Sequence, residues 1–193
     1  FYALYKYTER MNLPYGRSDF QYTGSILGSL SLYPILAIVG FDNWSNFDED
    51  GKVSLLYQMI AVPSGLFLSD RLYHKWKLTN GQATIVSSAP ALGVYNTFML
   101  LWLIKAEEWD EDITRFFVPL IYGGALAHGY WAKNYVENKS YSRDDGSFLS
   151  LSAGIGLFNS FGLMMITESD NEQFNKLLLL AGINGFTYLG EKI

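Results

Sequence analysis

The chain has 193 residues, 49% of them hydrophobic and 17% charged, so it is long enough for a sizeable core and more apolar than the usual globular balance of roughly 25% charged residues. Its net charge of −5 argues against a nucleic-acid-binding surface, because such a surface needs a basic stripe to neutralise phosphates. The absence of cysteine excludes disulfides, thiolate metal sites and a cysteine nucleophile. The mean hydropathy of +0.07 is modest for a polytopic membrane protein, so composition alone does not decide between water and lipid.

The chain opens with a short amphipathic fragment. Residues 1–12 stop just before a proline and a glycine, as the end of a helix does. Residues 4–6 are similar to residues 72–75, which close a later stretch, and residue 1 is not a methionine. We therefore expect residues 1–12 to be the tail of an earlier helix in a longer chain.

The first long uncharged stretch lies between Asp19 and Asp42. Gly24 and Gly28 stand four residues apart in it, and small residues at this spacing let two helix backbones approach closely. Pro34 falls inside the same stretch. It predicts a kink, because proline cannot donate the helical hydrogen bond.

The rest of the chain alternates uncharged stretches with polar or acidic loops. The uncharged stretches cover residues 53–69, 78–104, 116–132, 147–167 and 177–190, with N-cap residues at 142–146 before the fourth of them. At about 1.5 Å per residue, a helix over residues 78–104 is long enough to cross the roughly 30 Å hydrocarbon core of a bilayer. Apolar residues come in consecutive runs without a period of two, which favours helices over the strands of a membrane β-barrel, the alternative.

These stretches form a repeat. The sequence GVYNTF at 93–98 recurs as GLFNSF at 156–161. Longer helices are expected to start near residues 20, 80 and 145, and each of them is followed by a shorter helix. The shorter helices share a glycine at 65, 124 and 185. Helical hairpins of this kind stack, because a single hairpin cannot bury its own apolar surface. We therefore expect a single helical-repeat domain with repeats at about 16–77, 78–140 and 141–193.

Charged and aromatic residues mark two faces. The loops that follow the longer helices are strongly acidic, whereas the opposite helix ends are mildly basic, and Trp and Tyr residues lie near both edges. Aromatic belts at two levels are typical of membrane interfaces, and the positive-inside rule places the basic side in the cytoplasm. The fold predicted is all-α: three repeated helical hairpins, six long helices plus the N-terminal helix tail, in a membrane-embedded bundle. A soluble helical array with acidic tips is the other interpretation.

A few polar residues stand inside the apolar stretches and are the candidate site residues. His128 is a candidate proton relay or ligand at membrane depth, or else a partner in a hydrogen bond to a neighbouring helix. Two repeated pairs, Asn96-Thr97 and Asn159-Ser160, either line a polar path or bond between helices, and their repetition favours packing. Asp70 and Arg71 close one of the shorter helices and are expected to pair with each other or to reach an interface.

The motifs that usually mark an enzyme are absent from the sequence. It lacks a phosphate-binding glycine loop, a zinc-binding His-Glu-x-x-His helix and a nucleophile elbow. The acidic loops at 42–52 and 105–115 could bind a divalent cation through carboxylates, but they lack the ordered ligand spacing of a calcium loop, so a solvated loop is favoured. We expect no catalytic residue, no metal site and no cofactor.

At two places, Tyr141-Ser142 or Leu78-Thr79 comes before a glycine-containing turn, and a Gly- and Ser-rich apolar helix follows. This combination resembles helical-repeat envelope proteins of Bacteroidota-type bacteria whose activity is unknown. The resemblance implies a bacterial envelope location and a place in a larger complex. It transfers no functional residue.

The sequence therefore predicts a non-enzymatic structural or assembly subunit of a membrane or envelope complex, whose partners are the lipid bilayer and other protein subunits and not nucleic acid. A transporter or channel built on internal repeats is the first alternative, with the polar residues around a path. A soluble helical-repeat binding protein is the second.

Overall fold

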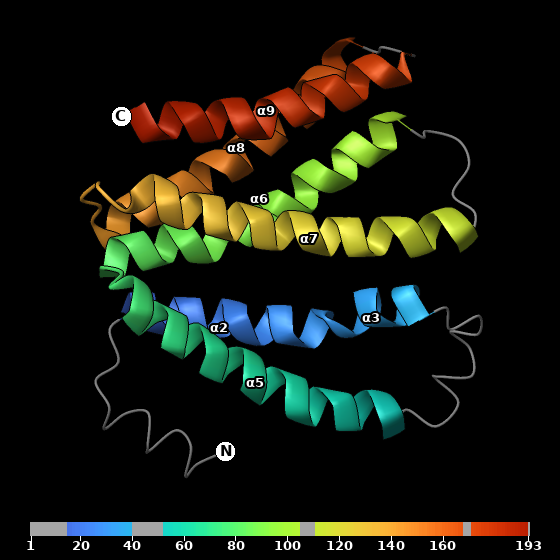
Figure 1. Cartoon of the computed structure of the whole chain (residues 1–193). Helices are drawn as coiled ribbons and strands as arrows, with labels where there is room; N and C mark the ends of the chain where they lie inside the picture. The colour runs from blue at the N-terminus through green and yellow to red at the C-terminus, as the bar shows by residue number, and fades with distance from the viewer. Residues whose placement is uncertain (1–14, 40–51, 105–110, 168–170, 193) are drawn as a thin grey trace.

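The computed structural model describes residues 15–39, 52–104, 111–167 and 171–192 (Figure 1). Within these ranges the chain is helical and contains no strand, which confirms the all-α prediction. The helices are α2 (Tyr15–Leu30), α3 (Leu32–Val39), α5 (Lys52–Trp76), α6 (Asn80–Ile104), α7 (Glu111–Val136), α8 (Arg143–Thr167) and α9 (Glu172–Lys192). The expected helix tail at 1–12 and the acidic loops at 42–51 and 105–110 lie outside the described residues.

The helices α2 and α3 together form one long helix that is interrupted at Ser31. Pro34 stands three residues later; its ring leaves the carbonyl of Leu30 without the usual amide donor, so the kink expected from the sequence is present. Side chains from two other helices bond to carbonyls next to the break. Tyr122 of α7 donates to the carbonyl of Leu27 at 2.9 Å, and Gln58 of α5 donates to that of Ser29 at 3.3 Å.

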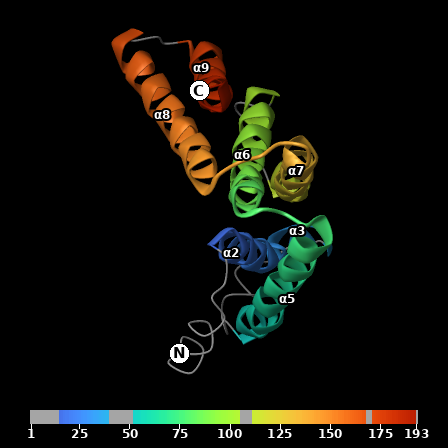
Figure 2. The same ribbon diagram turned by 90° about the vertical axis from the view of Figure 1, so that its left-hand side faces the viewer.

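The chain folds into three hairpins that stack in chain order. Each longer helix packs most extensively on the shorter helix of its own hairpin, giving the pairs α2 with α5, α6 with α7, and α8 with α9, whereas α3 packs on α7 of the second hairpin. Figure 1 shows the three pairs as successive layers, and the quarter-turn view in Figure 2 shows the same order along the stack. The central helix is α6, which also contacts α2 on one side and α8 and α9 on the other.

Within every hairpin the two helices cross at glycines. A Cβ atom at Gly65, Gly93 or Gly156 would overlap a backbone carbonyl oxygen of the facing helix, at Gly24, Gly124 and Gly182 respectively. A residue with a side chain at these positions would push the two helices apart. In the third hairpin the crossing glycine is Gly182, whereas the space around Gly185, the glycine that the repeat aligns with Gly65 and Gly124, is open.

Two helices begin with reciprocal caps. The amide of Gln82 bonds the side chain of Thr79 while the amide of Thr79 bonds the side chain of Gln82, at 3.4 and 3.0 Å. Ser142 and Asp145 form the same pair at the start of α8, at 3.2 and 2.6 Å. Such caps satisfy amide groups that a first helical turn leaves without partners. The cap at Ser142 starts α8 at Arg143, four residues before the apolar stretch begins.

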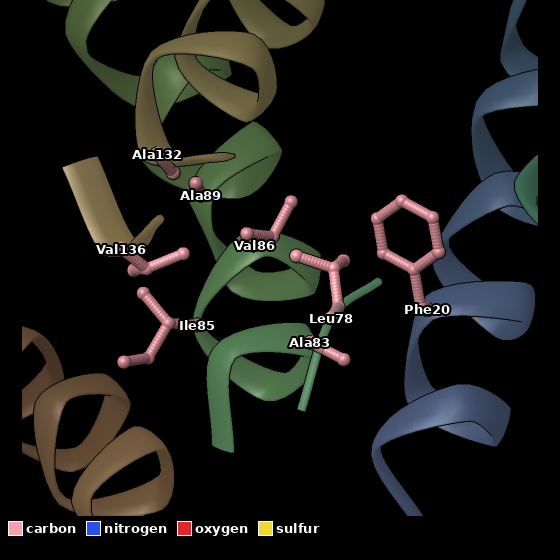
Figure 3. Packing of buried hydrophobic residues seen from close by; sticks show 8 residues of the cluster. All are labelled: Phe20, Leu78, Ala83, Ile85, Val86, Ala89, Ala132 and Val136. Atoms are coloured by element: carbon pink, nitrogen blue, oxygen red, sulfur yellow. The ribbon is translucent and has the colours of Figure 1, made fainter. Parts of the chain in front are cut away.

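The interior is built from small side chains. The main cluster joins α2, α6 and α7 and contains Phe20, Leu78, Ala83, Ile85, Val86, Ala89, Ala132 and Val136 (Figure 3). Alanines at 37, 61, 125 and 153 are buried elsewhere. The largest side chains that are almost fully buried are those of Lys176, Val86, Val136 and Ser160, so no large aromatic or Leu side chain belongs to that group.

Large apolar side chains point outward instead. Phe158, Met165 and Ile166 of α8 are about four-fifths exposed, with fractions of 81%, 80% and 79%. Residues such as Ile60 of α5 and Leu100 of α6 are exposed as well. Three helices, α5, α6 and α8, are long and apolar enough to cross a membrane by length and composition.

Candidate functional site

Two of the polar residues predicted from the sequence, Asn96 and His128, lie at a cavity between the second and third hairpins. The cavity has a volume of about 890 Å³ and is lined by α6, α7, α8 and α9. Asn96 and His128 line it, together with Asn184 of α9, which the sequence analysis did not single out. Apolar and small residues such as Ile85, Leu92 and Ala153 form most of the remaining wall.

Asn96 and Asn184 bind each other across the hairpin boundary. The Nδ2 atom of Asn96 donates to Oδ1 of Asn184 at 3.0 Å, and Nδ2 of Asn184 donates to Oδ1 of Asn96 at 2.8 Å. Asn184 donates a second bond to the carbonyl oxygen of Leu180 at 2.8 Å. This amide pair therefore satisfies itself and links α6 to α9 without any bound molecule.

His128 completes the cluster from α7. Its Nδ1 atom lies 3.0 Å from the carbonyl oxygen of Gly124, and because a carbonyl only accepts, Nδ1 carries the proton in the neutral ring. Its Nε2 atom lies 3.4 Å from Nδ2 of Asn96 and is left as the acceptor. The imidazole thus bonds its own helix and the neighbouring helix, which is the packing role that the sequence analysis weighed against a proton relay.

Thr97 and Ser160 lie at the helix crossings, away from the amide pair. Thr97 sits where a Cβ on Gly124 would be, and Ser160 stands in the same relation to Gly182. The hydroxyl of Ser160 is 2% exposed and lies 2.9 Å from the carbonyl oxygen of Gly156 and 3.1 Å from that of Leu178. The structure thus places both hydroxyl residues between the two helices of their own hairpin.

Gly24 and Gly28 occupy the matching crossing of α2 and α5. A Cβ on Gly24 would overlap Ser69, and one on Gly28 would overlap the carbonyl oxygen of Ala61. Asn159, the repeat partner of Asn96, is separated from this group of packing residues. It is exposed on α8, and its Nδ2 donates only to the carbonyl oxygen of Ile155 in its own helix, at 2.9 Å.

A second cavity of about 500 Å³ lies between the first and second hairpins. The hydroxyls of Ser31, Tyr57 and Tyr122, beside the break between α2 and α3, are among its polar groups. Ser31 and Tyr57 share a hydrogen bond of 2.6 Å. Each cavity therefore lies at a boundary between hairpins, and the side-chain amides of Asn96 and Asn184 line only the cavity of about 890 Å³.

An ion pair outside the three candidate spans lies at the basic end of the cavity of about 890 Å³, which Tyr135 and Glu191 line. The Nζ atom of Lys139 donates to Oε1 of Glu191 at 2.7 Å and lies 3.6 Å from the ring centre of Tyr135. The bond to Glu191 raises the pKa of Lys139, and the same bond lowers the pKa of Glu191. The pair ties the loop after α7 to the last turn of α9.

Lys176 is a buried charge that sequence reasoning did not single out. Its side chain is 0% exposed, and its Nζ atom lies 2.5 Å from Oε1 of Glu172 and 3.4 Å from the carbonyl oxygen of Trp102. The indole ring of Trp102 lies beneath it at 4.4 Å. Trp102 is in the last turn of α6, where carbonyls lack helical partners, so Lys176 caps α6 from α9.

The expected pairing of Asp70 with Arg71 is replaced by a contact between helices. Oδ1 of Asp70 accepts bonds from Nε of Arg17 at 2.7 Å and from Nε2 of Gln21 at 2.8 Å, both on α2. Residues 70 and 71 are neighbours on a helix and point in different directions, so a contact between helices is favoured over one along the chain.

The chemistry available to this arrangement is hydrogen bonding and packing. In the described ranges, no group of three or more His, Cys, Asp or Glu side chains could hold a metal ion. The ring nitrogens of His128 contact the side-chain amide of Asn96 and the carbonyl oxygen of Gly124. No protein-family model, curated protein or solved structure matches the chain.

Proposed function

We propose that this protein is a membrane-embedded, non-enzymatic subunit that gives structure to a membrane or envelope complex or assists its assembly. The observation that supports it is the distribution of side-chain size. Small residues occupy the interior while Phe158, Met165 and Ile166 stand exposed. In water this arrangement would expose large apolar patches, whereas in a bilayer the exposed side chains contact lipid and small residues let helices approach.

The geometry of the stack supports a structural role. Each longer helix packs on the facing helix of its own hairpin through glycines, and α2 and α6 also contact the next hairpin. The amide pair and the Lys176 cap fix the second and third hairpins to each other. Such a rigid array suits a scaffold that positions other subunits.

The proposal is tested first by fractionation. We expect the expressed chain to remain in the membrane pellet after alkaline carbonate washing and to need detergent to stay monodisperse. A chain that is monodisperse in aqueous buffer without detergent would favour the soluble repeat protein instead.

Mild detergent extraction from native membranes tests whether the protein is a subunit of a complex. We expect the chain to migrate in a complex larger than its own mass of 21.9 kDa. Migration of the extracted chain at that mass alone would contradict it.

A transporter or channel is the second candidate, supported by the cavity of about 890 Å³ that borders Asn96, His128 and Asn184. Reconstitution into liposomes separates the two functions. Solute flux that is lost in the Asn96→Leu variant, with the fold intact by circular dichroism, would establish transport. Equal background permeability of wild-type and variant liposomes would favour the structural role, since the amide pair already satisfies its own hydrogen bonds.

A further inference from the structure

We propose that the cavity of about 890 Å³ between the second and third hairpins binds a neutral, largely apolar alcohol. The hydroxyl group of this ligand donates a hydrogen bond to the side-chain oxygen of Asn96 or of Asn184. The structural role proposed above needs no such ligand, so this binding is a further function of the molecule. Its basis is the set of hydrogen-bonding groups that the cavity wall leaves unused.

The amides and the imidazole on the wall use all of their donors. The two N–H groups of Asn96 face Oδ1 of Asn184 at 3.0 Å and Nε2 of His128 at 3.4 Å. Those of Asn184 bond Oδ1 of Asn96 and the carbonyl oxygen of Leu180, both at 2.8 Å. The remaining donor, Nδ1 of His128, bonds the carbonyl oxygen of Gly124 at 3.0 Å. These three side chains therefore have no N–H group to offer to another molecule.

The same side chains keep acceptor positions. An amide oxygen has two lone pairs, whereas Oδ1 of Asn96 and Oδ1 of Asn184 each accept one hydrogen bond within the described part of the chain. Each oxygen can therefore accept one more bond. A ligand group that binds here must donate, so a hydroxyl group fits and an ether, ester or ketone oxygen does not.

The Ser and Thr hydroxyls on the wall also have their donors in use. Ser88, Ser150 and Thr187 line the cavity, and each donates to a carbonyl oxygen of its own helix, at 2.9, 3.2 and 2.6 Å. Trp131 and Tyr188 carry further donors, but their side chains are 62% and 60% exposed, so these donors are not confined to the interior. The interior of the cavity therefore offers acceptors and apolar groups.

The charged end of the cavity favours a neutral ligand over an ammonium ion. Among the described residues that line the cavity, Glu191 is the one with a carboxylate. It is already paired with Lys139 at 2.7 Å and hydrogen-bonded to Tyr135. An ammonium group would enter without a carboxylate of its own, and the burial of an unpaired charge is costly. A neutral amide ligand would bring a carbonyl oxygen that meets no donor, so the alcohol fits best.

The size and the walls of the cavity require an apolar body on this alcohol. Its volume of about 890 Å³ lies within the range of roughly 300–1,000 Å³ that is usual for small-molecule sites. Asn184 and Glu191 are seven residues apart on α9, which is about 10 Å at 1.5 Å per residue. The wall is rich in alanines, at positions 89, 91, 127, 132 and 153. A hydrocarbon chain or ring system therefore fills the space between the amides and the ion pair.

The test compares a fluorescent alcohol, pyrenebutanol, with its methyl ether, which has the same apolar body but no donor. Each probe is titrated into the purified chain in dodecyl maltoside micelles. Energy transfer from Trp131, which lines the cavity, reports binding, and the Trp131→Phe variant gives the share of the other tryptophans. We expect saturable transfer to the alcohol and about ten-fold weaker binding of the ether, because the ether lacks one hydrogen bond. Equal affinities, or no saturable transfer, would contradict the proposal.

Two variants of α7 test the place of binding. Ala127→Phe puts a ring into the cavity from an exposed position on its wall. The matched control is Gly123→Phe, one turn earlier, which lies outside the lining and where an added Cβ meets no atom within 4 Å. We expect the first variant to weaken binding of the alcohol several-fold and the second to leave it unchanged. The same affinity in both variants would place the probe elsewhere and overturn the proposal.

Asn184→Leu tests the chemistry. It removes an acceptor and frees an N–H group of Asn96, which can then donate to the ether oxygen. We expect the preference for the alcohol to fall from about ten-fold to about equal affinities. The readout is the ratio of the two affinities, because a general loosening of the cavity affects both probes alike. An unchanged ratio would refute the proposed contact. If this variant does not fold, the wild-type ratio and the α7 pair still decide.

These results are independent of the test of the proposed function. A failure to bind the alcohol would leave the chain in the membrane pellet. Recovery of the chain in the soluble fraction would refute the membrane role without changing the comparison of the two probes.

Discussion

The helices α6 and α8 have the same repeated segment but different surroundings. Gly93 and Gly156 pack against the facing helix of their own hairpin in the same way, each over a glycine carbonyl. Asn96 and Asn159 differ, because Asn96 bonds to the following hairpin and Asn159 bonds only to its own helix. Contacts inside a hairpin are therefore encoded by the repeated segment itself, whereas contacts between hairpins depend on which hairpin comes next.

The largest expected effect is at the contacts that both helices share. Gly93→Ala places a methyl group against the backbone of Gly124 and Ala125, so the two helices of the second hairpin must separate. We expect a loss of about 2–3 kcal/mol in the free energy of unfolding, measured in mixed micelles by denaturant titration. Gly154→Ala in α8, where the space is open, should be neutral or slightly stabilising. An equal change in stability for the two variants would show that the close contact at the crossing does not contribute.

Removal of the buried charge between the second and third hairpins comes next. Lys176→Met keeps the length of the side chain but removes the charged donor from the carbonyl of Trp102, and we expect it to cost about 2 kcal/mol. The control is Lys133→Met, which breaks the 2.8 Å ion pair with Glu137, four residues later and just beyond the end of α7, and should cost about 0.5 kcal/mol or less. Thermal unfolding in detergent compares the two. A smaller effect at residue 176 than at residue 133 would exclude the capping role.

The direct comparison of α6 with α8 uses one substitution at two equivalent places. Asn96→Leu breaks the bonds to Asn184 and should cost about 0.6–1.7 kcal/mol, the range measured for hydrogen bonds between membrane helices. Asn159→Leu should leave the stability of the isolated chain unchanged. Denaturant titration of both variants tests the pair. Equal losses would mean that Asn159 has a contact between hairpins in the isolated chain as well.

The smallest effect concerns pH. The lowered pKa of Glu191 means that its share of stability is present above its ordinary value of 4.5 and is lost as the pH falls through its folded-state pKa. The raised pKa of Lys139 means that its share is present below its ordinary value of 10.5 and is lost only as the pH rises through its folded-state pKa. Stability from this pair is therefore constant around neutrality and falls in acid. In the Lys139→Met variant, the loss of stability in acid should be smaller than in the wild type by about 0.5 kcal/mol or less. An identical loss in both proteins would show that the ion pair does not contribute to stability.

Much of the fold follows from the sequence because hydrophobicity and turn residues act locally. The uncharged stretches at 78–104 and 147–167 correspond closely to α6 and α8, and Pro34 accounts for the break between α2 and α3. The shorter helices extend beyond their uncharged stretches. Charged and polar residues at the ends of these helices, such as residues 70–76 of α5, continue the helix. Their long side chains can extend so that the polar groups reach the basic ends of the hairpins.

The contacts between helices were harder to predict. Two glycines of α9, Gly182 and Gly185, lie one turn apart, and which of them meets α8 depends on the rotation of the helix, which no local pattern sets. Asp70 pairs with Arg17, and Asn96 pairs with Asn184. Both pairs join residues far apart in the sequence, so the spacing of residues within one helix does not predict them. The repeat identified Asn96 as a packing residue but not its partner, because Asn184 has no equivalent in α7.

The proposed membrane role requires large apolar side chains to face lipid, and spin labels can measure this directly because the sequence contains no cysteine. A label at Phe158→Cys, whose native side chain is 81% exposed, is compared with one at Glu137→Cys, just beyond the end of α7. In liposomes we predict that the label at residue 158 collides mainly with oxygen and the label at residue 137 mainly with a water-soluble nickel chelate. Collisions with the nickel chelate as frequent at residue 158 as at residue 137 would contradict the membrane account.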